Sequence, residues 1–280
     1  MKLPFTKMHG LGNDFMVLDL TSGEIELSAE QIRRLSHRQF GIGFDQLLQI
    51  KSPSSHDVDF DYRIYNADGD EAEHCGNGAR CLAKFVYDNG LSNKNPLAVK
   101  TLNRILFLDT NENGEVTVDM GSPDFEPANI PFQTDQEAQL YTLSIELAGI
   151  SRDLEFVALS MGNPHAVISV EDLANTAVKD IGEAVGKHPD FPEGVNVGFM
   201  QILSHNEINL RVYERGAGET LACGTGACAA VAAGRLLEQL DDKVKVNLTG
   251  GQLTVSWQRS ESPVLITGPA TTVYEGTIEI

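Results

Sequence analysis

An internal repeat constrains the fold of this chain more than any other feature. The segment Cys75–Ala79 (CGNGA) resembles Cys223–Ala227 (CGTGA), which lies 148 residues later. Further matches follow in the same order along the chain, pairing Tyr65 with Tyr213, Asn66 with Glu214, Ala67 with Arg215, Glu71 with Glu219, Gly12-Asn13 with Gly162-Asn163, and Gln46 with Asn196. Ordered matches over half of the chain indicate an ancient duplication, so we expect two homologous domains related by a pseudo-twofold axis.

The turn-forming run Gly121-Ser122-Pro123 marks the boundary between the two halves. We therefore expect an N-terminal domain over residues 1–120 and a C-terminal domain over residues 121–268, with the active site in the cleft between them. The last residues alternate in the manner of a strand, and the stretch 269–280 is predicted to return to the first domain.

The secondary structure is expected to be mixed. Runs rich in β-branched and aromatic residues predict strands over 15–20, 46–50, 60–65, 106–108, 156–159, 165–170, 209–213 and 253–257. Helices are predicted over 28–38, where Ser28 and Gln31 form a capping box, and over 78–88 and 226–239. Because strands outnumber helices and no βαβ rhythm is present, we predict an α+β fold in which each domain is a mostly antiparallel sheet or barrel wrapped around a central helix.

The charge balance disfavours several classes of partner. The chain has 40 acidic and 21 basic residues, and its net charge of −19 repels nucleic acid and anionic membranes. No apolar run reaches the roughly 18 residues of a transmembrane helix, and the N-terminal segment lacks the apolar core of a signal peptide. We therefore expect a cytoplasmic protein that acts on a small molecule. Four cysteines without a secretory signal argue against a disulfide framework.

In each half of the repeat, a predicted strand and a loop lead into Cys-Gly-x-Gly, which opens a predicted helix. The glycines leave backbone amides uncovered at the helix start, where the amides and the helix dipole favour a bound carboxylate. The same field stabilises a thiolate, and the pKa of a cysteine there falls from about 8.5 to roughly 3.5–7.5. Each segment thus predicts both a carboxylate site and a reactive sulfur.

Two such sulfurs facing each other suit the inversion of a carbon that bears hydrogen. One base must remove the proton while an acid on the opposite face returns one. A thiolate and a thiol that exchange roles with the direction of reaction do this symmetrically, and the helix ends stabilise the negative charge that develops on the substrate. The sequence therefore predicts an amino-acid epimerase that uses no cofactor, with Cys75 and Cys223 as its catalytic residues.

Zinc binding and core packing are the alternatives for the cysteines. A zinc site would draw on Cys75, Cys81, Cys223 and Cys228, whose C-x5-C and C-x4-C spacings lie in or near the usual range. Cys81 and Cys228 occupy non-equivalent places of the repeat inside predicted helices, which favours core packing for these two. The symmetric placement of Cys75 and Cys223 favours catalysis, and no metal is predicted.

Short motifs of distinctive composition run along nearly the whole chain. They are His9–Phe15 (HGLGNDF), Gly43–Gln46 (GFDQ), Asn66–Gly69 (NADG), Glu73–Arg80 (EHCGNGAR), Gly162–His165 (GNPH), Val195–Val197 (VNV), and Glu214–Thr220 (ERGAGET) leading to Cys223–Gly226 (CGTG). Together these motifs resemble those of the diaminopimelate epimerase family. At the position of His74 we expect glutamine in members of the family. This departure leaves the resemblance intact and bears on the tuning of the neighbouring thiol.

The resemblance implies a pyridoxal-independent interconversion of LL- and meso-2,6-diaminopimelate in the synthesis of lysine and peptidoglycan precursors. It implies that Cys75 takes the proton from the L-configured centre and that Cys223 delivers one on the opposite face. By the same resemblance, the reacting carboxylate lies on the amides of Gly76, Asn77, Gly224 and Thr225. The other charged groups of the substrate are held by Asn13, Gln46, Asn66, Asn163, Asn196, Glu214 and Arg215. His165 is a candidate for tuning the site, and a homodimer is implied.

Other functions remain open at the level of sequence. Another two-thiol enzyme, such as proline racemase or hydroxyproline epimerase, would not need the Glu214-Arg215 pair and the asparagines around a second charged end. The phenazine-biosynthesis isomerase-like branch resembles this fold, but relatives there lack the cysteine pair. A non-catalytic amino-acid-binding relative is an alternative of a different class. For the individual residues, the structural alternatives are turn asparagines at Asn13, Asn66 and Asn163 and a surface ion pair between Glu214 and Arg215.

Overall fold

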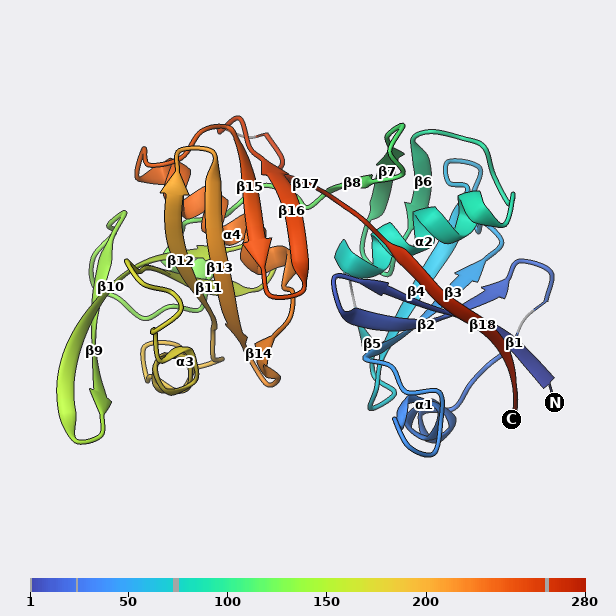
Figure 1. The fold of residues 1–280 in the computed structure, drawn as a ribbon, viewed down its shortest axis with the longest axis horizontal. Helices are drawn as coiled ribbons and strands as arrows, with labels where there is room; N and C mark the ends of the chain where they lie inside the picture. The colour runs from blue at the N-terminus through green and yellow to red at the C-terminus, as the bar shows by residue number, and fades with distance from the viewer. Residues whose placement is uncertain (1, 24, 73–75, 260–261) are drawn as a thin grey trace. The chain divides into compact units, whose positions relative to one another are not determined.

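A computed structural model describes residues 2–23, 25–72, 76–259 and 262–280 of the chain (Figure 1). The chain divides into two compact units. Unit 1 holds the chain up to Asp119 together with Thr267–Ile280, and unit 2 is Met120–Ile266. The division falls beside the turn-forming run that begins at Gly121.

Unit 1 is a mixed sheet with two helices. Its elements are β1 (Lys2–Gly10), β2 (Asn13–Leu20), α1 (Ala29–Ser36), β3 (Gln46–Lys51), β4 (Phe60–Asn66), β5 (Glu71–Ala72), α2 (Gly76–Asp88), β6 (Leu97–Lys100), β7 (Ile105–Thr110), β8 (Val116–Asp119) and β18 (Thr271–Glu279). The strands pair in the order β18, β1, β2, β3, β4, β6, β7, β8, with β5 also paired to β4. The pairs β2–β3 and β4–β6 are parallel, and the other pairs are antiparallel.

Unit 2 repeats this arrangement. Its elements are η1 (Pro127–Asn129), β9 (Tyr141–Leu147), β10 (Ile150–Ser160), β11 (Pro164–Ser169), α3 (Val178–Gly186), β12 (Asn196–Ser204), β13 (Glu207–Glu214), β14 (Gly218–Thr220), α4 (Gly224–Leu236), β15 (Lys243–Leu248) and β16 (Gly251–Ser256). After these, β17 (Leu265–Gly268) returns the chain to unit 1. The pairs β11–β12 and β13–β15 are parallel, at the places equivalent to the two parallel pairs of unit 1.

The duplication is visible in the strand register as well as in the strand order. The parallel pair Phe15–Gln46 of unit 1 has its counterpart in His165–Asn196 of unit 2, with both partners shifted by 150 residues. The first strand of each repeat pairs with the strand that follows the end of the other repeat, since β1 pairs with β18 and β10 pairs with β9. The prediction of an α+β fold with two pseudo-symmetric, mostly antiparallel halves is confirmed.

A buried helix lies at the centre of each unit. In α2 and α4 most residues are buried, and each helix contacts strands from both ends of its sheet. The α4 helix is rich in alanine because its neighbours approach from several sides. Cys81 and Cys228 are completely buried in these two helices, which agrees with their predicted place in the core.

The helix boundaries show where sequence patterns were informative. The predicted capping box of α1 is present, since the Ser28 hydroxyl accepts from the Gln31 amide and the Gln31 side chain accepts from the Ser28 amide. The sequence did not predict α3, because Ala177 provides no side-chain cap and two glycines interrupt the helical pattern.

Within the parts of the chain that the structure describes, no helix combines the length and the apolar character needed to cross a bilayer.

Candidate active site

Cys223 is the N-cap residue of α4 in unit 2, and its backbone is extended there. Its sulfur accepts a hydrogen bond from the Gly226 amide, with an N–S distance of 3.4 Å. By the geometry of a helix start, the amides of Gly224 and Thr225 have no acceptor within the helix. The predicted combination of a sulfur and uncovered amides is therefore present at the start of α4.

Glu214, at the end of β13, lies directly beside this sulfur. The Cys223 thiol donates to Oε2 of Glu214 at 3.2 Å, and the Thr220 hydroxyl donates to Oε1. No ion pair joins Glu214 to Arg215 among the described residues, so the alternative of a surface ion pair between them is not observed. The carboxylate instead faces the thiol.

The pKa of Cys223 differs from the expectation for a helix start. Burial raises the pKa of this thiol well above its ordinary value, and the negative charge of Glu214 raises it further. Hydrogen bonds from Thr225 and from the Gly226 amide act in the opposite direction but are outweighed. The expected lowering of the pKa is therefore wrong for Cys223, because the side chain is only 4% exposed and has a carboxylate as its neighbour.

A chain of side-chain contacts continues from Cys223 through unit 2. The sulfur lies 3.6 Å from Oγ1 of Thr225, and this hydroxyl accepts from the amide of Asn163 at 3.4 Å. Oδ1 of Asn163 in turn lies 3.0 Å from Nε2 of His165. Five of the predicted site residues are thus linked in the order Glu214, Cys223, Thr225, Asn163 and His165.

His165 is buried as a neutral ring. Burial lowers its pKa to about 3, and the positive charge of Arg215 adds to this effect. Its Nδ1 atom is buried and has no hydrogen-bond partner among the residues described. The neutral ring therefore supports the orientation of Asn163 without contributing charge.

Asn196 fixes the backbone on both sides of the unit 2 site. Its side chain donates to the Pro164 carbonyl at 3.1 Å and accepts from the Arg215 amide at 2.9 Å. The exposed Arg215 side chain donates to the Glu193 carbonyl at 3.0 Å and makes no ion pair with the described residues. Its remaining guanidinium donors are consequently available to a carboxylate.

The equivalent part of unit 1 is the start of α2, which begins at Gly76. Asn77, which is 4% exposed, donates from Nδ2 to Oδ1 of Asn13 at 3.1 Å. The Asn13 amide then donates to Asp45 at 3.0 Å, and Arg80 donates to Oδ1 of Asn77 at 2.8 Å. The structure thus brings together Asn13, Asn77 and Gly76. Cys75 lies outside the described residues.

Gln46 and Asn66 form a second contact in unit 1, with Nε2 of Gln46 donating to Oδ1 of Asn66 at 2.9 Å. In the repeat these two positions correspond to Asn196 and Glu214. The half-site of unit 1 therefore carries a neutral amide where the half-site of unit 2 carries a carboxylate.

Three residues that the sequence analysis assigned no role support these groups. Asp45 accepts from Asn13, Arg80 orients Asn77, and Thr220 donates to Glu214. All three lie within or next to the quoted motifs, so proximity to a motif was the available signal. Among the described residues, no group of three or more His, Cys, Asp and Glu side chains is placed to hold a metal ion.

Comparison with known proteins places these features in a family. The sequence pattern of the family described as diaminopimelate epimerase matches residues 5–126 and 157–273. A diaminopimelate epimerase of Nitrosomonas europaea is 52% identical over 280 residues, and the match covers all of both chains.

Two solved structures share the fold at low identity. A Bacillus anthracis protein of the PhzF phenazine-biosynthesis family has a TM-score of 0.70 at 18% identity and covers all of both chains. A hydroxyproline epimerase of Agrobacterium vitis has a TM-score of 0.68 at 16% identity, over 99% of this chain and 92% of that one.

Proposed function

Because the chain belongs to the diaminopimelate epimerase family, we propose that it interconverts LL- and meso-2,6-diaminopimelate by moving one proton at the α-carbon. The reaction is an isomerisation in the synthesis of lysine and peptidoglycan precursors. It uses a pair of cysteines, Cys75 and Cys223, and no cofactor. The observation that carries the proposal is the buried Cys223 thiol, which lies at a helix start and donates to Glu214 at 3.2 Å.

The surroundings of Cys223 favour a thiol at rest. Burial and Glu214 both raise its pKa, so this sulfur holds its proton and is ready to act as the acid. The residue of the repeat that corresponds to Glu214 is Asn66, which carries no charge. We infer that Cys75, with the neutral partner, is the thiolate when the LL-substrate binds.

The proposed proton transfers then balance without any other reactant. The Cys75 thiolate takes the α-proton from the L-configured centre, and the Cys223 thiol gives its proton to the opposite face of the same carbon. Cys75 ends as the thiol and Cys223 as the thiolate, which the Gly226 amide stabilises. Reversal of these roles converts the meso-compound back.

Recognition of the substrate is proposed to use both helix starts and the polar residues around them. The amides of Gly76, Asn77, Gly224 and Thr225 hold the reacting carboxylate, where negative charge develops during proton removal. The remaining ammonium and carboxylate groups contact Asn13, Gln46, Asn66, Asn163, Asn196, Glu214 and Arg215. The guanidinium of Arg215 forms no ion pair with the described residues and keeps donors beyond its bond to the Glu193 carbonyl, which supports its assignment to a carboxylate. In this scheme residues 1–120 with 269–280 and residues 121–268 are the two epimerase domains, and each contributes one helix start to the reaction.

Assembly and location are proposed from the family resemblance. We propose a cytoplasmic homodimer, because family members are typically homodimers and the substrate is a biosynthetic metabolite. Light scattering coupled to size exclusion tests the assembly: a mass near 30.4 kDa, that of one chain, would contradict it. Fractionation of the cell that produces the protein tests the location.

A deuterium wash-in assay tests the function. The protein, dialysed against chelator and without pyridoxal phosphate, is incubated with LL-diaminopimelate in D2O, and α-deuteration is followed by NMR. We expect deuterium at one α-carbon and growth of the meso-isomer, with neither outcome for proline or hydroxyproline. The Cys223→Ala variant is the matched control and should lose epimerisation. Binding of diaminopimelate without deuteration would instead support a non-catalytic relative, and turnover of proline would support another two-thiol racemase.

A further inference from the structure

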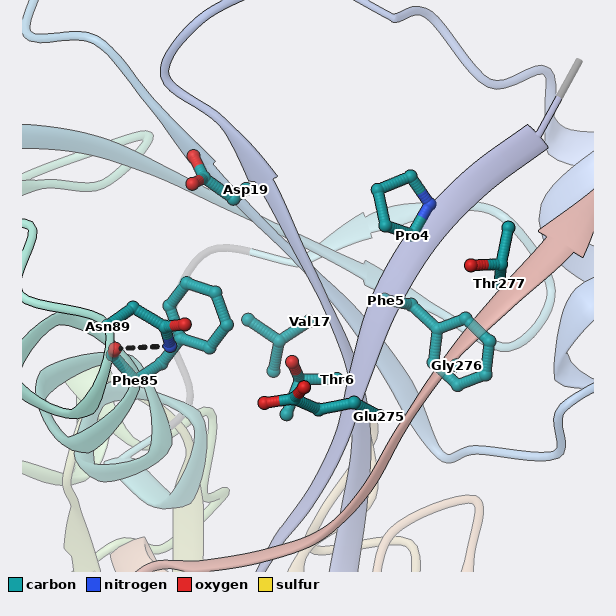
Figure 2. A pocket seen from close by; sticks show the side chains of 10 residues that line it. All are labelled: Pro4, Phe5, Thr6, Val17, Asp19, Phe85, Asn89, Glu275, Gly276 and Thr277. Carbon is teal, nitrogen blue, oxygen red and sulfur yellow. Dashed lines mark hydrogen bonds between the residues drawn. The ribbon is translucent and has the colours of Figure 1, made fainter.

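A cavity of about 520 Å³ opens in unit 1 between the strands β1, β2 and β18 and the last turn of α2 (Figure 2). None of the predicted site residues lines it. Its walls are formed by Pro4, Phe5, Thr6, Val17, Asp19, Phe85, Asn89, Glu275, Gly276 and Thr277. The volume falls in the range of small-molecule sites, about 300–1,000 Å³.

The polar groups that line this cavity are mainly hydrogen-bond acceptors. Asn89 uses its amide nitrogen to donate to the Phe85 carbonyl at 2.9 Å, which leaves its Oδ1 as an acceptor (Figure 2). Asp19 and Glu275 contribute carboxylates, and neither forms an ion pair with a residue that the structure describes. Oδ1 of Asp19 accepts from the amide and the hydroxyl of Thr21 at 2.9 and 2.7 Å, which leaves Oδ2 for a ligand. No lysine, arginine or histidine lines the cavity. A ligand that fits must therefore bring donors and positive charge.

Thr6 is an independent indication that a polar ligand enters. Its residue is only 8% exposed, and its hydroxyl makes no hydrogen bond with the described residues, although it lines the cavity. The hydroxyl itself is not among the buried unpaired atoms, so it is open to the cavity and can hydrogen-bond with a molecule there. Thr6 pairs with Glu275 across β1 and β18, and Figure 2 shows the two side chains beside each other, so one group in the cavity can reach both.

The duplication supplies an internal comparison. Unit 2 has a cavity of about 140 Å³ at the equivalent place, lined by Leu140, Glu155, Val157, Val167, Ser169, Met200, Ala233, Leu237 and Gln239. The strand registers show which positions are equivalent. In unit 1, Thr6 of β1 pairs with Val17 of β2 and with Glu275 of β18. In unit 2, Val157 of β10 pairs with Val167 of β11 and directly follows Phe156, which pairs with Tyr141 of β9.

The two copies have diverged in chemistry. Val157 stands in place of Thr6, Ser169 in place of Asp19, Leu140 in place of Glu275, and Leu237 in place of Asn89. Each of these positions is more polar or more acidic in unit 1. One framework thus carries a smaller cavity in unit 2, with Glu155 as the carboxylate of its lining, and a larger cavity with the two carboxylates Asp19 and Glu275 in unit 1.

We propose that the unit 1 cavity binds a small aliphatic diamine in its dicationic form. Its ammonium groups pair with Asp19 and Glu275 and donate to Thr6 and Asn89, and its methylene chain lies against Val17 and Phe85. An amino acid is disfavoured, because its carboxylate would face the two acidic side chains. This site is separate from the proposed epimerase function and does not depend on it.

Calorimetric titration with 1,5-diaminopentane tests the proposal, with 1,5-pentanediol as the uncharged probe of the same length. We expect the diamine to bind the wild-type protein and the diol not to bind. The double variant Asp19→Asn/Glu275→Gln keeps the shapes of the side chains and should weaken binding by about tenfold or more. The matched control Asp57→Asn/Glu112→Gln removes the same charge from exposed positions in unit 1 and should bind as the wild type does.

Amide chemical shifts locate the bound probe. Perturbation at Thr6, Asn89 and Gly276 on addition of the diamine supports the site, and both double variants should retain wild-type epimerase activity. Equal weakening in the two double variants would show a general charge effect and overturn the proposal. So would equal binding of the diol, perturbation confined to other residues, or no binding at millimolar diamine.

Discussion

The thiol of Cys223 donates a hydrogen bond of 3.2 Å to the carboxylate of Glu214, and the same carboxylate also accepts from Thr220. A nucleophilic sulfur at a helix start usually gains acidity from the helix, whereas here the neighbouring carboxylate and burial oppose that gain. This contact makes the chemistry of Cys223 depend on a residue nine positions earlier in the chain.

Replacement of Glu214 by Gln is expected to lower the pKa of Cys223, because it removes a negative charge while burial remains. Alkylation of Cys223, followed by mass spectrometry of its peptide, should then begin at lower pH than in the wild type. Epimerisation should fall by about 10²-fold, since proton handling at the sulfur is disturbed. The Glu219→Gln variant is the matched control, because Glu219 pairs with Arg211 and should leave the alkylation profile unchanged. An unchanged profile in Glu214→Gln would contradict this account.

Stability at alkaline pH should also report on Cys223. Its pKa in the folded protein lies above the value in the unfolded chain, so the unfolded state releases its proton first. The stabilisation is fully present below the ordinary thiol pKa of about 8.5 and is lost as the pH rises above it. We expect the free energy of unfolding to decline more steeply above that pH in the wild type than in Cys223→Ser. Urea titrations at a series of pH values measure the slopes, and parallel slopes would exclude the effect.

Acid should destabilise the protein through His165. The folded protein holds its pKa at about 3, while the unfolded chain has the ordinary value of 6.5, so the unfolded state binds the proton first. The stabilisation is present above the unfolded pKa and is lost as the pH falls toward the folded one. Between about pH 6.5 and about pH 5 the loss is about 2 kcal/mol. His165→Gln should flatten this slope even if it is less stable at neutral pH, whereas the exposed His56→Gln variant should follow the wild type.

The repeat made much of the architecture predictable. The matched positions of Tyr65 with Tyr213 and Glu71 with Glu219 anticipate equal registers, and the structure shows Tyr65 opposite Glu71 and Tyr213 opposite Glu219. Each glutamate also receives two hydrogen bonds from the arginine eight residues before it, Arg63 in unit 1 and Arg211 in unit 2. A duplication preserves the strand registers, because both partners of a pair are shifted together along the sequence.

Properties that depend on three-dimensional burial were not accessible in this way. The raised pKa of Cys223 depends on how deeply α4 is enclosed, which no local pattern reports. The link from Asn163 to Thr225 joins residues 62 positions apart, and the cavity of unit 1 joins the first strand to the last. Motifs in the sequence predicted the residues of the site, whereas the burial and the contact that raise the pKa of Cys223 follow only from the folded structure.

Gly226 is expected to be essential because of the space around it. A Cβ atom at this position would lie 2.9 Å from Cγ2 of Val212 and 3.2 Å from the sulfur of Cys223. The branched valine is stiff, so the sulfur would have to move. We expect Gly226→Ala to lose about 1–3 kcal/mol of stability from overpacking, and to lose epimerase activity beyond what unfolding explains, because the thiol no longer meets Glu214 as it does in the wild type.

Gly186→Ala provides the matched control for Gly226→Ala, since Gly186 also lies in a helix and its Cβ would be 3.7 Å from the nearest atom, the Val195 carbonyl oxygen. Its stability should be equal to or above that of the wild type, with unchanged kcat. Thermal denaturation and steady-state epimerisation of the two variants, measured side by side, separate packing from catalysis. If Gly226→Ala kept wild-type kcat while losing stability, the position of the Cys223 sulfur would not limit the reaction, and the proposed role of the contact with Glu214 would have to be given up.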